Sequence, residues 1–140
     1  MHTCILWGEM FDEAFAVTVA VRLRRAGLAV QLVGLQGRQA TGAAGLLLGC
    51  DLTLGEALPW ASTSAAVVVP AHTPHFHALE LNPRAERFLA TAHEHGAAIV
   101  TGRVAPIDAV LFPCALHRLQ SCPTPATYDA VAERLCALYQ

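Results

Sequence analysis

The chain has 140 residues, of which 54% are hydrophobic and 14% are charged, and its formal net charge is −2. This length fits a single domain spanning 1–140 with a core of its own, and the composition lacks the signs of disorder. All nine basic residues are arginine, which excludes Schiff-base chemistry, a phosphate-loop lysine and pyridoxal attachment. No basic stripe with interleaved aromatics indicates a nucleic-acid partner.

The sequence carries no sign of a membrane or secretory context. No apolar run approaches the ~18 residues of a membrane span, and the first residues lack a basic region followed by an apolar core and a cleavage site. The cysteines are scattered and never form C-x-x-C, so we expect reduced, mostly buried thiols in a cytoplasmic protein. These cysteines are Cys4, Cys50, Cys114, Cys122 and Cys136.

Strands and helices alternate along the first half of the chain. We predict a short strand at 4–8 and a helix at 11–27, with acids at its start, arginines in its last turn and Gly27 as its cap. A second strand is predicted at 28–35. A turn and hairpin and then an apolar run follow it, since the glycines of QGRQATGAAG do not precede a helix start, as those of a phosphate loop would.

The second half continues this alternation. The run 64–70 is typical of a strand buried on both faces, and a helix within 78–96 is punctuated by Asn82-Pro83. The order of elements predicts a parallel sheet with helices on both faces. The remaining predicted elements are a strand at 97–100 that exits at Thr101-Gly102, a short helix from Arg103, a strand at 115–121 and a closing helix at 124–140 with Thr124 as N-cap and Pro125 at its first position.

Residues 95–106, HGAAIVTGRVAP, have the layout of an active-site corner between a buried strand and a helix. In α/β proteins a reactive side chain often lies at such a corner, beside the first free N–H groups of the helix. Here the corner carries Val100, which can be neither nucleophile, acid nor base.

Four stretches carry a family resemblance: FDEAFAVTVAVRLRRAGLAVQLVGL, GAAGLLLGCDLTLGEA, AAVVVPAHTPHFHALELNPRAERFLATAHEHGAAIVTG and CPTPATYDAVAERLCALY. In this order they resemble the first helix with the second strand, the hairpin, the segment up to the nucleophile corner, and the final helix of the ThiJ/PfpI family, in the class I glutamine amidotransferase-like superfamily. The resemblance covers nearly the whole chain. It implies a reduced, flavodoxin-like three-layer α/β/α sandwich with a mostly parallel sheet.

The active site that this resemblance implies has lost its reactive groups. Val100 stands where the family has its nucleophilic cysteine, and Phe15 stands where it has the glutamate that hydrogen-bonds the sulfur; Asp12 and Glu13 are alternative positions for that acid. A buried carboxylate without a partner is costly, so losing the cysteine favours an apolar replacement. We expect Val100 and Phe15 to approach each other and fill the former site with hydrocarbon.

Two further segments depart from the family pattern. The P-G-G turn, whose backbone N–H helps form an oxyanion site, is Pro70-Ala71-His72 here. Only about a dozen residues separate Phe112 from Pro125, so the segment that carries the family's partner histidine is absent. Thr101 is expected to cap the following helix. Val100, Thr101, Phe15 and His72 together form a vestigial site, for which we expect no cofactor.

Two function classes follow from these losses. The first, which we favour, is a non-catalytic binding or interaction module. The resemblance implies self-association, since the family commonly forms dimers, often through the first helix and the neighbouring hairpin. The second is a hydrolase, amidase or deglycase-like enzyme with a relocated cysteine, either Cys50 or Cys114 paired with His117.

Three histidines support a third class, a metal-binding or sensing domain. His72, His75 and His77 follow a parallel strand, at the edge of the sheet where open α/β folds bind ligands. With Glu9 they would offer ligands to zinc or another divalent ion. The spacing H-x-x-H-x-H matches no closed zinc pattern, so surface and capping histidines are the simpler interpretation. His93 and His95 are expected at the end of a helix.

Overall fold

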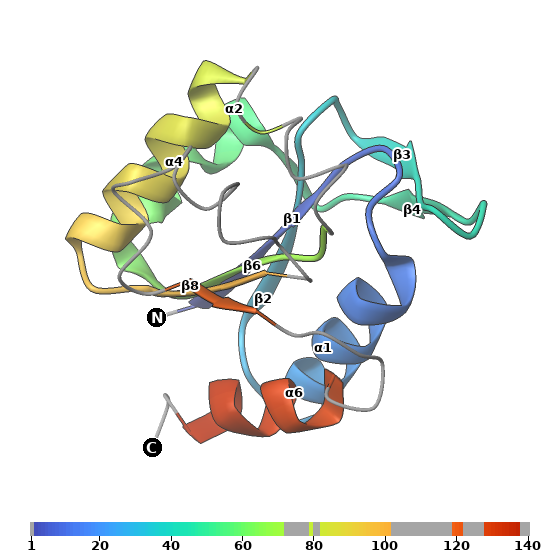
Figure 1. Ribbon diagram of the computed structural model, residues 1–140. Coiled ribbons are helices and arrows are strands. Elements are labelled where there is room, and N and C mark those ends of the chain that lie inside the picture. The colour runs from blue at the N-terminus through green and yellow to red at the C-terminus, as the bar shows by residue number, and fades with distance from the viewer. Residues whose placement is uncertain (1, 72–78, 80–81, 102–118, 122–127, 138–140) are drawn as a thin grey trace.

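A parallel sheet of six strands is the centre of the fold (Figure 1). The computed structural model describes residues 2–71, 79, 82–101, 119–121 and 128–137. The strands are β1 (His2–Trp7), β2 (Val30–Gly34), β5 (Leu52–Thr53), β6 (Ser64–Val69), β7 (Ala98–Thr101) and β8 (Leu119–Ser121). Their order is β5-β2-β1-β6-β7-β8, and every pair of neighbours is parallel.

Helices cover both faces of this sheet. One face carries α1 (Glu13–Arg25) and α6 (Tyr128–Ala137), and the other carries α2 (Leu54–Ala57), the 3₁₀ helix η1 (Leu58–Thr63) and α4 (Pro83–Glu94) (Figure 1). This arrangement confirms the predicted α/β/α sandwich with a parallel sheet. No helix among the described residues is long and apolar enough to span a membrane.

The central strands owe their position to continuous apolar sequence. All six residues of β1 are buried, and four consecutive residues of β6, Ala66 to Val69, are fully buried. A strand covered by helices on both faces needs apolar side chains on both, so these runs place β1 and β6 next to each other in the middle. The predicted strands at 4–8, 28–35 and 64–70 are therefore confirmed, with ends that shift by a few residues.

Helix termini follow the residues that disfavour or cap a helix. The side chain of Asp12 accepts the N–H of Phe15 at the start of α1, and Gly27, with φ +79°, follows its end. Asn82 and Pro83, expected within a longer helix, are instead the N-cap and the first residue of α4. These local signals shorten both predicted helices to 13–25 and 83–94.

The segment between β2 and β6 holds a predicted and an unpredicted feature. The hairpin is confirmed: β3 (Gln39–Thr41) pairs with β4 (Leu47–Gly49) in antiparallel register, and the indole of Trp7 donates to the carbonyl of Ala40 at 3.0 Å. No helix was expected at 54–63, yet α2 and η1 lie there. The signal was the capping box of Thr53 and Glu56, since the Thr53 hydroxyl accepts the N–H of Glu56 and the Glu56 carboxylate accepts that of Thr53.

At the carboxyl side of the sheet one boundary needs correction. Thr101, expected in the turn after the strand, is the last residue of β7, where its backbone pairs with that of Ser121. The strand expected within 115–121 is confirmed as β8. The short helix from Arg103 and the caps at Thr124 and Pro125 lie outside the described residues. Of the segment between Phe112 and Pro125, the structure describes β8 alone.

Candidate functional site

The corner at Val100 is packed into the core. Val100 is the penultimate residue of β7, in register with Val68 of β6 and Gln120 of β8. Only 4% of its surface is exposed, and Thr101 is fully buried. The position that the family resemblance assigns to a nucleophile is therefore occupied by a hydrocarbon side chain between neighbouring strands.

An aromatic pair occupies the space beside the first turn of α1. Phe15 is fully buried and stacks on Tyr128 of α6, with ring centroids 4.6 Å apart and an interplanar angle of 11°. Stacked rings of this kind contribute about 1 kcal/mol beyond the area they bury. Phe15 and Val100 are thus both core residues, while their approach to each other stays a prediction.

Asp12, one of the alternative acids, joins three elements. Its backbone N–H donates to the carbonyl of Pro70, just after β6, at 2.7 Å. One carboxylate oxygen accepts the N–H of Phe15, and the other accepts the hydroxyl of Tyr128. Both oxygens therefore accept hydrogen bonds, one from α1 and one from α6. The carboxylate of Asp12 thus joins these two helices.

Glu13, the other alternative acid, points into the hairpin. Its side chain accepts the N–H of Ala44 at 3.0 and 3.1 Å and that of Leu46 at 3.1 Å, and only 4% of the residue is exposed. Burial opposes ionisation, but these N–H donors outweigh it and hold the pKa of Glu13 below its usual value. The charge is stabilised by the hairpin and is not aimed at the corner.

Two of the described thiols, Cys50 and Cys4, lack the environment of a nucleophile. Burial raises the pKa of Cys50 to about 11, and the negative charge of Asp51 adds to this effect. Cys4 is fully buried, and burial raises its pKa too, although its hydrogen bond with Ser64 opposes the shift. A thiol with a raised pKa stays protonated near neutral pH and reacts slowly. Cys114, Cys122 and His117 lie outside the described residues.

The proposed metal ligands are mostly beyond the described part of the chain. His72, His75 and His77 all lie outside it, and Glu9 accepts the N–H of Thr41 at 3.3 Å. Within the described residues no group of three His, Cys, Asp or Glu side chains is placed to hold a metal ion. His93 and His95 are at the C-terminal end of α4, as expected, and the ring of His95 contacts the carbonyl of Thr91 at 2.9 Å.

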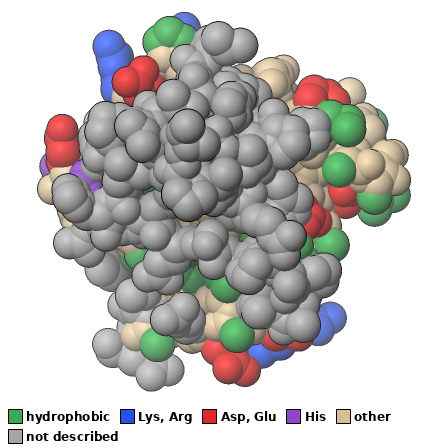
Figure 2. Space-filling model, in the orientation of Figure 1, with side chains coloured by type: hydrophobic (Ala, Val, Ile, Leu, Met, Phe, Trp, Pro, Cys, Tyr) green, Lys and Arg blue, Asp and Glu red, His purple; other side chains and the backbone are tan. Residues whose placement is uncertain are grey.

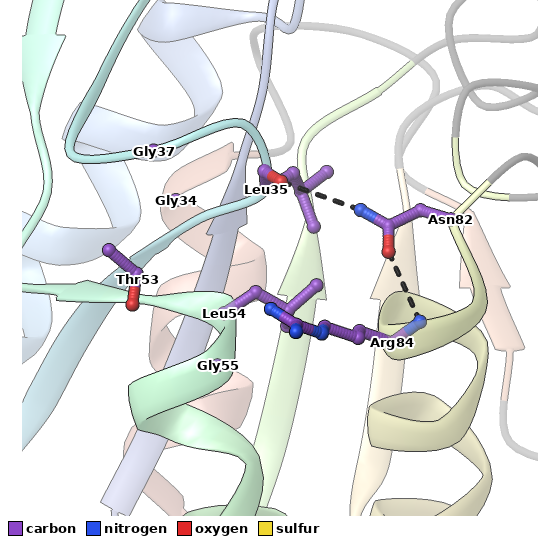
Figure 3. A pocket seen from close by; sticks show the side chains of 8 residues that line it. All are labelled: Gly34, Leu35, Gly37, Thr53, Leu54, Gly55, Asn82 and Arg84. Atoms are coloured by element: carbon purple, nitrogen blue, oxygen red, sulfur yellow. Dashed lines mark hydrogen bonds between the residues drawn. The ribbon is translucent and has the colours of Figure 1, made fainter.

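A cleft that sequence reasoning missed opens at the carboxyl edge of the sheet (Figure 3). It measures about 410 Å³ and lies between the ends of β2 and β5 and the starts of α2 and α4. It is lined by three glycines, two leucines, two uncharged polar residues and one arginine. The lining residues are Gly34, Leu35, Gly37, Thr53, Leu54, Gly55, Asn82 and Arg84.

Glycines and one amide give the cleft its shape. A Cβ atom on Gly34 would lie 1.7 Å from the carbonyl oxygen of Gly37, so only glycine permits this loop to fold back on β2. The amide nitrogen of Asn82 donates to the carbonyl of Leu35 at 3.4 Å, which ties the start of α4 to the end of β2 (Figure 3). The Asn-Pro and Thr-x-x-Glu motifs were the only sequence signals for this region.

The comparisons with known proteins point to one group of folds. A scan against protein-family models and a search of curated proteins give no match to this sequence. Among solved structures, oxidized DJ-1 of Toxoplasma gondii is similar with a TM-score of 0.79 at 14% identity, over 99% of this chain and 90% of that one. DJ-1beta of Drosophila melanogaster is similar with a TM-score of 0.75 at 19% identity, over 96% and 91%.

A third structure adds a comparison with somewhat higher identity. It is a two-domain protein of Anabaena variabilis with DJ-1/ThiJ/PfpI-like and ferritin-like domains, similar at 25% identity with a TM-score of 0.68, over 81% of this chain and 34% of that one. The structural neighbours are thus DJ-1/ThiJ/PfpI superfamily proteins. They confirm the resemblance seen in the sequence at the level of the fold.

Proposed function

We propose that this chain, which has the fold of the DJ-1/ThiJ/PfpI superfamily, is a shortened, divergent member of it. In this proposal it is a single cytoplasmic domain that acts as a non-catalytic binding or interaction module. The observation that carries the proposal is Val100, a buried hydrocarbon side chain at the end of β7. Covalent catalysis of the family type needs a thiolate at this corner, stabilised by a polar neighbour. By the resemblance, the position of that neighbour is Phe15, which stacks on Tyr128.

Restoring the two lost groups tests this proposal. We expect Val100→Cys with Phe15→Glu to show no hydrolase, amidase or deglycase turnover above that of the wild type, because Phe15 is fully buried against Tyr128 and a carboxylate there has no pocket. Val100→Cys alone, a smaller change within the core, serves as the variant that keeps the fold, checked by circular dichroism. Turnover by the wild type, or brisk turnover by either variant, would refute the proposal.

Thiol labelling separates this proposal from an enzyme with a relocated cysteine. We expect the native wild-type protein to react with a thiol-directed electrophile more slowly than the same chain unfolded in denaturant, because an activated cysteine must be both ionised and exposed. Mass spectrometry after partial labelling identifies each modified residue, including Cys114 and Cys122. A single native thiol that reacts about tenfold faster than the unfolded thiols at the same pH would favour the enzyme.

We also propose that the protein forms a homodimer through α1 and the β3–β4 hairpin. Five exposed apolar residues, here named the apolar strip, support this arrangement: Met10, Val17, Val21, Leu46 and Leu47. Figure 2 shows hydrophobic side chains gathered over the hairpin, on the right of the molecule. In the family that the sequence resembles, the dimer interface is often formed by these two elements.

The apolar strip is continuous because the hairpin lies beside the face of α1 that carries Val17 and Val21. Glu13, Val17 and Val21 are spaced by four residues, so they lie along one face of α1. The hairpin covers Glu13 through the N–H of Leu46 but leaves Val17 and Val21 uncovered, with 42% and 38% of their surfaces exposed. The exposed side chains of α1 therefore lie next to the hairpin residue Leu46. A partner that covers the exposed face of α1 also contacts the hairpin.

A further inference from the structure

Arg84 places a positive charge at the cleft that no described carboxylate neutralises through an ion pair. Arg22, Arg24 and Arg38 each form an ion pair, whereas Arg84 forms none with a residue that the structure describes. Its side chain extends from the first turn of α4 toward the start of α2 (Figure 3). The guanidinium group thus lies at the cleft and forms no ion pair with a described residue.

Glu56, the acidic residue of α2, already has hydrogen-bond partners. One carboxylate oxygen of Glu56 accepts the backbone N–H and the hydroxyl of Thr53, at 3.1 and 3.0 Å, and also the guanidinium of Arg38 at 2.7 Å. Hydrogen bonds from Thr53, helped by Arg38, lower the pKa of Glu56. This carboxylate is committed to the capping box and to Arg38, so it does not neutralise Arg84.

Space for a ligand exists beside the guanidinium because residue 55 is glycine. A Cβ atom on Gly55 would lie 3.3 Å from Nη1 of Arg84, so the guanidinium passes directly over this residue. Gly34 and Gly37 also lack side chains on the opposite wall, and Leu35 and Leu54 provide the apolar part of the lining. A longer side chain at position 55 would displace Arg84 or fill the cleft.

The first main-chain N–H groups of α4 already donate to Asn82, so they are not the groups that bind the ligand. The side-chain oxygen of Asn82 accepts the N–H groups of Arg84 and Ala85 at 3.1 and 3.2 Å. Asn82 in turn donates to the carbonyl of Leu35, just after β2. Recognition at this site therefore depends on the Arg84 side chain, while Asn82 fixes the turn that carries it.

We propose that the cleft between β2, β5, α2 and α4 binds a small organic anion, a compound whose carboxylate or phosphate group pairs with Arg84 and whose apolar part contacts Leu35 and Leu54. The planar guanidinium matches the two oxygens of a carboxylate or phosphate. The carboxyl ends of parallel strands are also where open α/β sheets bind ligands. This site shares no lining residue with the corner at Val100, so the proposal does not rest on the absence of catalysis.

Titration with simple probes tests the site. Phenyl phosphate carries a phosphate group on a phenyl ring, and benzoate carries a carboxylate on the same kind of ring. Phenol is the neutral control. We expect saturable shifts of the backbone amide signals of Gly34, Gly55 and Arg84 in NMR spectra with at least one anion and none with phenol. The anion that binds more tightly identifies the preferred group. Absence of saturable shifts with both anions would overturn the proposal.

Two variants at the cleft and one matched control decide whether Arg84 is the recognising group. Arg84→Gln is expected to weaken binding at least about tenfold, since a hydrogen bond to a charged group is worth ~1.5–3 kcal/mol. Gly55→Val should weaken it similarly by filling the space. Arg87→Gln removes the same charge from an exposed position of the same helix, outside the lining, and should change affinity less than about twofold. Equal losses in Arg84→Gln and Arg87→Gln would reduce the effect to net charge and refute the site.

Discussion

The carboxylate of Glu13 holds the β3–β4 hairpin against the first turn of α1. It accepts N–H groups from Ala44 and Leu46 in the hairpin loop, where a backbone that reverses direction cannot satisfy all of its donors by strand pairing. The adjacent Gly42 donates its own N–H to the carbonyl of Leu46 and leaves room for the carboxylate. A charged residue that sequence reasoning weighed as a catalytic acid is thus an anchor of the hairpin.

Replacing Glu13 with glutamine should destabilise the protein in a pH-dependent way. We expect Glu13→Gln to lower the free energy of unfolding by about 2 kcal/mol near neutral pH, because an amide NH₂ replaces one accepting oxygen. Folding lowers the pKa of Glu13, so its contribution is complete above the unfolded carboxyl pKa of ~4.3 and is lost as pH falls through the folded pKa. Urea unfolding at several pH values measures this difference, which should shrink toward acid pH.

The exposed Glu94→Gln, at the end of α4, is the control for that experiment. It should change the free energy of unfolding by less than about 0.5 kcal/mol at every pH. A difference between Glu13→Gln and wild type that grows on acidification would contradict the role assigned to this carboxylate.

Two glycines of the hairpin should respond oppositely to a methyl group. A Cβ atom on Gly42 would lie 2.2 Å from an oxygen of Glu13, whereas one on Gly49 would meet nothing within 4 Å. We expect Gly42→Ala to cost about 2 kcal/mol of unfolding free energy through overpacking. Gly49→Ala should be neutral or slightly stabilising, since it reduces the entropy of the unfolded chain. Thermal unfolding of both variants tests the contrast, and equal melting temperatures would show that the loop shifts at little cost.

At the level of elements, the sequence predicts those helices and strands whose ends or burial are determined by residues within the element itself. Gly27 and the arginines near it mark the end of α1, and the apolar run of β6 marks a central strand; both are confirmed. The short helix α2 was missed because its apolar residues, Leu54 and Ala57, continue the run that begins at Leu46. Only the capping box separates helix from strand there, and four residues carry too little periodicity to show it.

The cleft could not be predicted because it depends on the packing of distant elements. Its residues come from the ends of β2 and β5 and the starts of α2 and α4, so their meeting follows from the strand order and not from any spacing in the chain. The corner at Val100 is the opposite case. One short stretch of sequence specifies it, so the resemblance could suggest that Val100 stands where the family has its cysteine, and this assignment stays a prediction.

The docking of α6 on α1 should depend on one buried hydroxyl more than on surface charge. The hydroxyl of Tyr128 donates to the part-buried Asp12, while Arg22 pairs with Asp129 at 2.8 Å and with Glu133 at 3.7 Å across exposed side chains. We expect Tyr128→Phe to lower the unfolding free energy by about 1–2 kcal/mol, because it leaves a carboxylate oxygen short of a donor. Arg22→Gln should cost less than about 1 kcal/mol, and less still at high salt. Urea unfolding with and without added salt ranks the two, and a larger loss in Arg22→Gln would reverse this assignment.

At the scale of the whole molecule, the sheet has the architecture of its structural neighbours, and the corner at Val100 is part of the hydrophobic core. Val68 and Val100 lie in register on β6 and β7, so a valine continues the hydrophobic interior at the point where a reactive group would need polar surroundings. Among the described residues, the two surfaces that we propose to be functional are the cleft at Arg84 and the apolar strip over α1 and the hairpin.

The apolar strip should be the surface through which the protein associates with a second copy. Leu46 and Leu47 are each 58% exposed, and together with Val17 they form a patch that water solvates poorly. We expect wild type to sediment as a dimer and Val17→Glu to sediment as a monomer, because a carboxylate buried in an apolar interface has no partner. Ser62→Glu adds the same charge on η1, across the sheet from α1, and should leave the dimer intact. Sedimentation velocity at several concentrations tests all three proteins, and a wild type that is monomeric throughout would refute the dimer.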